Sequence, residues 1–300
     1  MEKIMNSAIP DKDDVLNGEL VYEGDRVFIY RLADCLYFRK ANLLERGQCN
    51  GVYIVGGGAV AAVDIPTMEA AVEMENEIRM LFGLPLRYIF LTHPHKDHID
   101  GIGHFLGSSV TFIVSSLLAS ELSRSYRGKN KALFMGIDRD ALLYLGDTEI
   151  RVFTSGYTMH SPYDLFVHLP KEKALCTGDC VVEPWILYYH SADVKNWIAG
   201  LRQIGRQSYR LVLPGHGPVF GPDVIGKTAD FLQSLYDLAG RSIDELAPGE
   251  RCDLDASTID RITDRIFCRP EAALIKQNGG AEAERQFRMV FRRRLYEFLK

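Results

Sequence analysis

Three histidines and two aspartates occur within eight residues of this sequence. They are His93, His95, Asp97, His98 and Asp100. Neutral imidazole and carboxylate are the ligands of borderline cations such as zinc, and the spacing His-x-His-x-Asp-His lets alternate residues face one ion while the adjacent pair turns to a second. One such histidine alone would more simply cap a turn, but this density of ligand side chains favours a metal site with two ions.

An apolar run directly precedes the cluster. The residues Tyr88-Ile89-Phe90-Leu91 are typical of a buried strand. The histidines are therefore expected on the loop that leaves the carboxyl end of that strand, where ligand loops commonly lie.

The cluster also resembles a known signature. His93-x-His95-x-Asp97-His98 is similar to the defining motif of the metallo-β-lactamase superfamily. The resemblance implies an αββα sandwich with a one- or two-metal site, and covers roughly residues 20 to 220. It also implies three further ligands in a set order: a lone histidine, an aspartate at a strand end, and a histidine in a glycine-rich turn.

All three further ligands occur in the implied order, as His160, Asp179 and His216. The resemblance assigns His93, His95 and His160 to the first metal, Asp97, His98 and His216 to the second, and Asp179 to the bridge between them. Zinc is the expected metal, although iron and manganese suit the same ligands. The cofactors are thus two divalent metal ions.

An aspartate at the bridging position resembles one branch of the superfamily, that of glyoxalase II, lactonases, arylsulfatases and tRNA-processing nucleases. The β-lactamase branch that uses cysteine there differs. The loop after His160 and the segment after Asp179, which runs from Cys180 to Trp185, depart from the glyoxalase II and lactonase patterns. The specificity within the branch therefore stays open.

The resemblance predicts a binuclear metal-dependent hydrolase in which a metal-bridging hydroxide cleaves a small ester, thioester or lactone. Asp97 is the expected catalytic residue, because a carboxylate ligand of the second metal can orient the hydroxide and relay its proton. Two alternatives remain open: a phosphodiesterase or nuclease of the same superfamily, and a regulatory protein that retains the metal site.

Substrate contacts are expected from the aromatic segment that follows the bridging aspartate. The candidates are Trp185, Tyr188, Tyr189 and His190, whose rings could stack on an acyl or aryl group. Such residues equally often fill the gap between a sheet and a helix, so this alternative stays open.

The composition limits the other possibilities. The chain has 300 residues, of which 47% are hydrophobic, and a formal charge of -5. This charge disfavours general binding to nucleic acid or anionic membranes. The six scattered cysteines are expected to be reduced thiols. The N-terminus shows no signal peptide and no apolar run spans a membrane, so a cytoplasmic protein with a small-molecule substrate is predicted.

The expected organisation is a metal-dependent hydrolase domain over 1–220 followed by a helical extension over 221–300. The extension is predicted either to close over the metal cleft or to form a homodimer interface. The expected strands are 20–22, 27–30, 51–55, 59–64, 88–91, 110–114, 150–153, 164–169, 173–176 and 210–213, and the expected helices before the extension are 67–82, 115–124 and 191–207.

Some residues allow two interpretations. Asp64 matches the family aspartate that buttresses the metal loops, or it only caps the turn before Pro66. The apolar segment 132–136 walls the active site or, with a slight preference, forms a surface turn on the core. Met68, Met74 and Met80 are interpreted as core filler, and His104 and His168 as structural residues.

Overall fold

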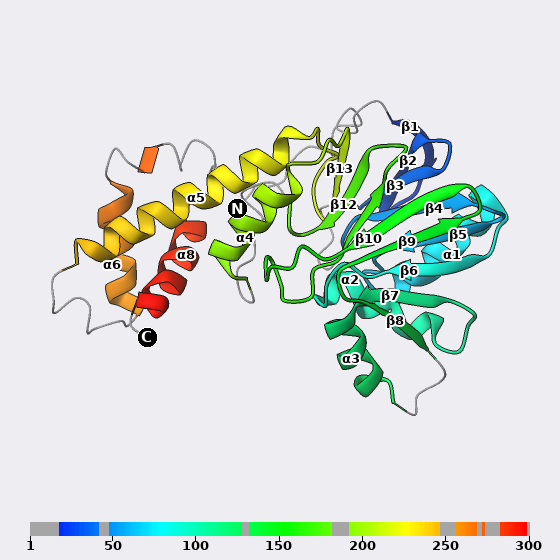
Figure 1. The fold of residues 1–300 in the computed structure, drawn as a ribbon, viewed down its shortest axis with the longest axis horizontal. Coiled ribbons are helices and arrows are strands. Elements are labelled where there is room, and N and C mark those ends of the chain that lie inside the picture. Colours follow the sequence, from blue (N-terminus) through cyan, green and yellow to red (C-terminus); the bar gives the residue numbers. More distant parts are fainter. Residues whose placement is uncertain are drawn as a thin grey trace, which may run out of the picture. The chain divides into compact units, whose positions relative to one another are not determined.

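The computed structural model describes residues 18–41, 48–127, 132–181, 192–246, 256–268, 272–273 and 283–298 (Figure 1). The chain divides into two compact units. The first comprises 1–156, 163–179 and 207–222, and the second comprises 157–162, 180–206 and 223–300. The prediction of separate domains over 1–220 and 221–300 stays a prediction.

The described part of the first unit contains two β-sheets. The larger sheet has the strand order β1 to β8, with antiparallel pairing from β1 to β5 and parallel pairing from β5 to β8. Its strands are β1 (Glu19–Glu23), β2 (Val27–Ala33), β3 (Leu36–Ala41), β4 (Gly51–Gly56), β5 (Ala59–Val63), β6 (Leu86–Phe90), β7 (Thr111–Ser115) and β8 (Leu133–Ile137).

The smaller sheet has the order β13-β12-β11-β10-β9. Its members are β9 (Asp140–Leu145), β10 (Thr148–Phe153), β11 (Phe166–Leu169), β12 (Ala174–Gly178) and β13 (Leu211–Pro214). The last two strands, β12 and β13, are parallel to each other, so their carboxyl ends meet at the same edge of the sheet.

The inner faces of the two sheets pack against each other. Phe38 and Ile54 of the first sheet share one buried apolar cluster with Val152 and Val167 of the second. Strand β5 is buried along its whole length, because alternate residues serve this cluster and a second one on the outer face of the larger sheet.

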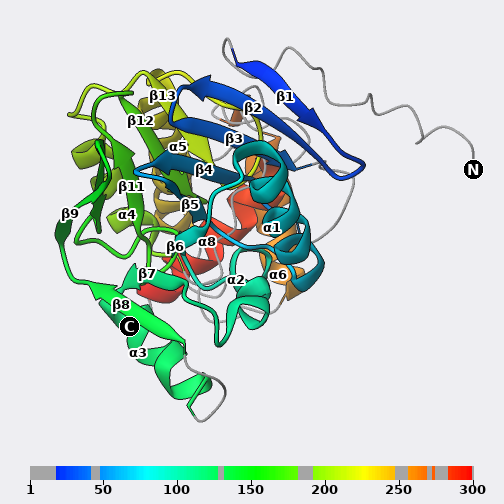
Figure 2. The ribbon, with the colours of Figure 1, turned by 90° about the vertical axis from the view of Figure 1, so that its right-hand side faces the viewer.

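Two helices cover that outer face, as Figure 2 shows for α1. Helix α1 (Met68–Phe82) contributes Met74 and Ile78 to the outer cluster, and helix α3 (Ser116–Ser125) contributes Leu118. Thr67 accepts a hydrogen bond from the N–H of Ala70 at the start of α1, as its predicted role as N-cap requires.

Sequence patterns located most of these elements, and the differences have physical reasons. The segment 132–136 is not a surface turn, because Leu133–Ile137 pairs as strand β8 with β7, and its predicted role as a wall of the active site stays a prediction. Strands β3 and β9 were not predicted. Met74 is buried, whereas Met68 is 44% and Met80 is 62% exposed. The interpretation of these two as core filler is therefore wrong, since they lie on the solvent side of α1.

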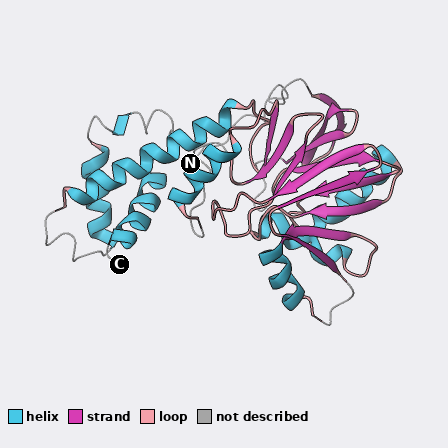
Figure 3. Cartoon of the chain, viewed as in Figure 1, coloured by secondary structure: helices cyan, strands magenta, loops and turns pink. Residues whose placement is uncertain are grey.

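The described part of the second unit is helical, and Figure 3 distinguishes its helices from the strands of the first. Its helices are α4 (Val194–Ile204), α5 (Asp223–Asp244), α6 (Ala256–Phe267) and α8 (Ala283–Phe298). Helix α5 packs against α4 and α8. Helix α4 begins after Asp193, whose side chain accepts a hydrogen bond from the N–H of Asn196. The predicted start at Ser191 lies outside the described residues.

The described cysteines carry free thiols, in agreement with the expectation of reduced cysteines: Cys35, Cys49, Cys176, Cys180 and Cys268. Among the described helices, none combines the length and the apolar character that crossing a membrane requires.

Candidate metal centre

Three loops at one edge of the two sheets carry the ligand-type residues of the first unit. The loop after β6 carries His93 and His95, and continues into the short helix α2 (Lys96–Ile99) and the 3₁₀ helix η1 (Asp100–Phe105). Asp179 directly follows β12, and His216 follows β13. Each ligand loop therefore leaves the carboxyl end of a strand, as the sequence predicted for the first loop.

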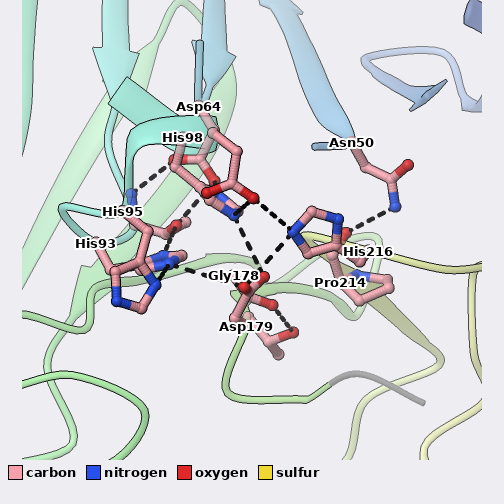
Figure 4. A network of polar contacts seen from close by, with 12 residues as sticks. Asn50, Asp64, His93, His95, His98, Gly178, Asp179, Pro214 and His216 are labelled. Carbon is pink, nitrogen blue, oxygen red and sulfur yellow. Dashed lines mark hydrogen bonds and ion pairs between the residues drawn. The ribbon is translucent and has the colours of Figure 1, made fainter. Parts of the chain in front are cut away.

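The first group of ligand atoms consists of His93, His95 and Asp179. The Nε2 atom of His93 lies 3.0 Å from Nδ1 of His95 and 3.8 Å from an Asp179 oxygen. A tetrahedral ion with bonds of 2.0–2.1 Å separates its ligand atoms by roughly 3.3 Å. These three side chains therefore converge at the spacing that one cation requires (Figure 4).

The second group consists of Asp97, His98 and His216. The Nε2 atom of His216 lies 3.1 Å from Oδ2 of Asp97. Asp179 faces both histidines, since its oxygens lie 3.4 Å from Nε2 of His98 and 3.6 Å from Nε2 of His216. Asp179 thus contacts both groups, and the bridging role that the resemblance implies for it stays a prediction.

Asp64 fixes the orientation of this loop and does more than cap a turn. Its carboxylate accepts hydrogen bonds of 2.8 Å from both the backbone N–H and the hydroxyl of Thr92. An oxygen of the same carboxylate lies 2.8 Å from Nδ1 of His98. The other nitrogen of that ring, Nε2, is therefore directed toward Asp179. Asp64 adopts a φ of 60°, a conformation that is rare outside glycine. Of the two interpretations, the buttressing role is the one that the contacts support.

Glycines allow the three loops to approach one another. A Cβ atom at Gly215 would lie 2.3 Å from an oxygen of Asp179 and 2.6 Å from the ring of His98. A Cβ atom at Gly178 would lie 2.6 Å from the hydroxyl of Thr92, and this glycine has a φ of 50°. A side chain at Gly215 would therefore displace Asp179 or His98, and one at Gly178 would displace Thr92, the residue before His93.

The acidic and imidazole side chains of the centre shift one another's pKa values. Burial disfavours the charge of Asp179, yet the imidazoles of His216 and His98 hold the pKa of its carboxyl well below its ordinary value. Burial opposes the protonated form of His98 as well, but the surrounding acidic groups, Asp179 and Asp64 among them, raise its pKa well above the usual value. The pKa of His216 is raised against burial by Asp179 and Asp97.

This donor set fits divalent metal ions. The Nε2 atom of His98 is buried and, within the described residues, has no hydrogen bond of normal geometry. A buried ring nitrogen of this kind calls for a partner, and its second nitrogen is already oriented by Asp64, as is usual for histidine ligands of metals. Imidazole nitrogens and carboxylate oxygens are the ligands of zinc, iron and manganese.

His160, the remaining predicted ligand, lies in the second unit. Its side chain is buried and its ring packs edge-on against Trp197, with centroids 5.5 Å apart. Its assignment to the first metal stays a prediction. The expected substrate-contacting residues lie outside the described residues: Trp185, Tyr188, Tyr189 and His190.

The histidines interpreted as structural lie apart from the two groups. Nε2 of His104 lies 3.0 Å from a carboxylate oxygen of Glu75. His168 lies on β11 with its ring against Tyr209, at a centroid distance of 5.1 Å, and burial lowers its pKa. Neither belongs to a group of ligand atoms among the described residues.

Sequence reasoning anticipated Asp64 but missed two other residues that support the ligands. Cys49 lies with Asp64 and His98 in one buried group, and burial raises the pKa of its thiol to about 11, so that it is protonated. Asn50 hydrogen-bonds the loop that carries His216. In the sequence, the signal that could have indicated Cys49 and Asn50 is their position directly before the apolar strand β4.

The chain is similar in sequence to known proteins. No protein-family model matches the chain. A beta-lactamase-like protein 2 homolog from Caenorhabditis elegans is 22% identical over 196 residues, and the match covers 62% of this chain and 61% of that protein. Ribonuclease J 1 from Streptococcus pyogenes is 26% identical over 98 residues, covering 31% of this chain. The chain thus spans 61% and 18% of the lengths of these two relatives.

Solved structures show the fold. A metallo-beta-lactamase from Erythrobacter litoralis superposes with a TM-score of 0.60 at 20% identity, covering 71% of this chain and 98% of that one. A metallo-beta-lactamase from Pontibacter korlensis gives 0.57 at 19% identity, covering 72% and 99%. The chain therefore has the metallo-β-lactamase fold, and the predicted fold class is confirmed.

Proposed function

We propose that this chain, which has the metallo-β-lactamase fold, is a binuclear metal-dependent hydrolase. The observation that carries the proposal is the convergence of two ligand groups on one sheet edge, with Asp179 in contact with both. Divalent ions at such a centre lower the pKa of a water to near neutrality and polarise the oxygen of a substrate carbonyl.

The protein's own residues divide the remaining work. His93, His95, His98 and His216 supply neutral donors, together with His160 by the resemblance. Asp179 compensates the charge of the cations. The side chain of Asp97 is 31% exposed, compared with 12% for Asp179 and 3% for Asp64. Among these carboxylates, Asp97 is therefore best placed to accept a proton while substrate is bound.

The proposed substrate is a small ester, thioester or lactone. An aspartate at the position of Asp179 resembles the glyoxalase II and lactonase branch, and the formal charge of -5 disfavours a polyanionic substrate. The 98-residue similarity to ribonuclease J 1 supports a phosphodiesterase as the second candidate, but only weakly, because it covers 18% of that protein.

Metal analysis and a substrate panel test the proposal. Protein purified without chelator should contain about two transition-metal ions per chain. It should hydrolyse members of a panel of p-nitrophenyl esters, thioesters and acyl lactones in preference to bis-p-nitrophenyl phosphate, and chelator should abolish the hydrolysis. Fewer than about one ion per chain would contradict the metal centre, and a preference for the phosphodiester would favour the second candidate.

A matched pair of histidine variants controls for nonspecific damage. His93→Ala removes a nitrogen of the first group, whereas His104→Ala removes a histidine that lies outside both groups and contacts Glu75. His93→Ala should lose metal and hydrolysis, and His104→Ala should retain both. Equal loss in the two variants would mean that histidine removal acts through folding and not through metal binding.

A further inference from the structure

Asn50 connects the start of β4 to the loop that carries His216 (Figure 4). Its side chain is 4% exposed, and Nδ2 donates hydrogen bonds to the carbonyls of Pro214 at 3.1 Å and Gly217 at 2.9 Å. Oδ1 accepts a hydrogen bond of 3.0 Å from the N–H of Ala41. The backbone N–H of Asn50 donates to the carbonyl of Gly215 at 2.7 Å.

These contacts hold the backbone directly before and directly after His216. The loop between Pro214 and Gly217 is not a helix or strand, and Gly217 adopts a φ of 91°. Before His216, the regular pairing of β13 with β12 ends at Pro214, and the N–H of Gly215 donates to the carbonyl of Gly178 at 2.9 Å; after it, the first pairing is the isolated bridge at Phe220. Between these points, Asn50 makes three of the hydrogen bonds that hold the loop at His216.

The chemistry of the contacts selects asparagine. Two carbonyl oxygens and one N–H group face the side chain, and a primary amide offers two donors and an acceptor in one plane. Aspartate has the same shape but no donor when it is ionised, and alanine leaves all three groups without a partner. Each buried backbone group that loses its partner destabilises this conformation of the loop.

We infer that Asn50 is a positioning residue that sets His216 for the second metal ion. The inference rests on the proposed function and adds a residue that contacts no ligand atom of the centre. To bind the second ion, Nε2 of His216 must stay within a few tenths of an ångström of its position in the structure. There it lies 3.1 Å from an oxygen of Asp97 and 3.6 Å from an oxygen of Asp179. Without the hydrogen bonds of the Asn50 side chain, the loop would not hold His216 in this position.

Metal affinity is the direct test. The variants are Asn50→Ala, which removes every side-chain bond, Asn50→Asp, which removes the donors, and Asn50→Ser, which retains one donor. Each is titrated with zinc against a chromophoric chelator, and cobalt absorption spectra distinguish the two ions. The second ion should bind about 10- to 100-fold more weakly in Asn50→Ala and Asn50→Asp, with Asn50→Ser between these variants and wild type, while the first ion is retained.

Tyr53→Phe is the control for a loss of stability without a loss of positioning. Tyr53 lies on β4, which begins directly after Asn50, and is fully buried, but its hydroxyl donates to Glu77 of α1, outside the metal groups. It should keep both metal affinities. Equal weakening of both ions in the Asn50 variants, or no weakening of the second, would overturn the inference. A wild type that binds fewer than two ions would instead contradict the proposed function on which it rests.

Discussion

At the scale of single residues, the two carboxylates of the centre differ in exposure and in contacts. Asp179 faces His93, His98 and His216, whereas Asp97 lies to one side with its contact to His216. A carboxylate in the middle of a cation pair holds the ions, and one at the side can exchange a proton. The two residues should therefore respond differently to the same substitution.

Asp179→Asn should lose metal and activity together, because a neutral amide cannot compensate two cations. The measurement is metal content and turnover on one preparation, with Asp140→Asn as the control. Asp140 pairs with Arg151 on the surface, away from the ligands. An Asp179→Asn protein that retains two ions per chain would contradict the bridging role.

Asp97→Asn should keep at least the first metal while turnover falls by roughly 10² to 10⁴, the range for loss of a positioned general base. Metal content and the pH dependence of turnover decide the outcome, because the loss of a base also removes the acid limb of the profile. Near-normal turnover with both metals bound would show that Asp97 is only a ligand.

At the scale of elements, α1 is attached to the larger sheet by a buried ion pair. Glu77 of α1 accepts hydrogen bonds from Arg39 of β3 at 2.8 Å and 3.1 Å and from the hydroxyl of Tyr53. All three side chains are at most 2% exposed. A charged pair buried this deeply leaves an uncompensated charge when either member is removed.

Glu77→Ala should therefore lower the free energy of unfolding by about 3–5 kcal/mol, because Arg39 would stay buried without its partner. Glu73→Ala is the matched control on the same helix, since Glu73 lies 3.5 Å from Arg39 but is 38% exposed. It should cost less than about 1 kcal/mol. Denaturant unfolding measures both, and similar effects would mean that the buried pair contributes no more than the exposed one.

Periodicity located the elements whose two faces differ, and missed those whose environment is set by the tertiary fold. Helix α1 was predicted from its apolar spacing and its Thr67 cap. Strand β3 was not, because Arg39 and Lys40 are charged in sequence but buried in the fold. Strands β8 and β9 lie at the sheet edges, where exposed Leu133 and Leu142 conceal the alternation of a strand.

Candidate ligands could be predicted from the sequence because their signal is chemical. Histidine and aspartate at fixed spacing mark a metal loop whatever surrounds it. The supporting residues carry no such mark: Asn50 is one polar residue before a strand, and its partners at Pro214 and Gly217 lie more than 160 residues away. Such contacts can be recognised only in the folded structure, because the residues that make them lie far apart in the sequence.

At the scale of the whole molecule, the stability of the protein should depend on pH in opposite ways with and without metal. In metal-free protein, the raised pKa values of His98 and His216 stabilise the fold below their unfolded value near 6.5, and this contribution is lost as pH rises through the folded pKa. The lowered pKa values of Asp97 and Asp179 stabilise it above about 4, and this is lost as pH falls.

Metal-free protein should therefore be most stable between about pH 4 and 6.5, whereas stabilisation by zinc should grow toward pH 8 because ligand imidazoles must release their protons. Thermal unfolding with zinc and with chelator, at pH 5.5 and pH 8, measures both trends. A zinc-induced increase in Tm that is larger at pH 5.5 than at pH 8 would contradict the ligand assignment.

The ligand loops of the first unit all follow the carboxyl ends of strands, so among the described residues the opposite edge of the sandwich carries none of these ligands. The turn between β2 and β3 lies at that edge, and the side chain of Asp34 is fully exposed there. A short Gly/Ser-rich peptide inserted after Asp34 should leave metal content and turnover unchanged, and both are measured against the unmodified protein. The fold thus provides its own attachment point, through which the protein could be tethered to a surface or fused to another protein with the ligand loops facing outward.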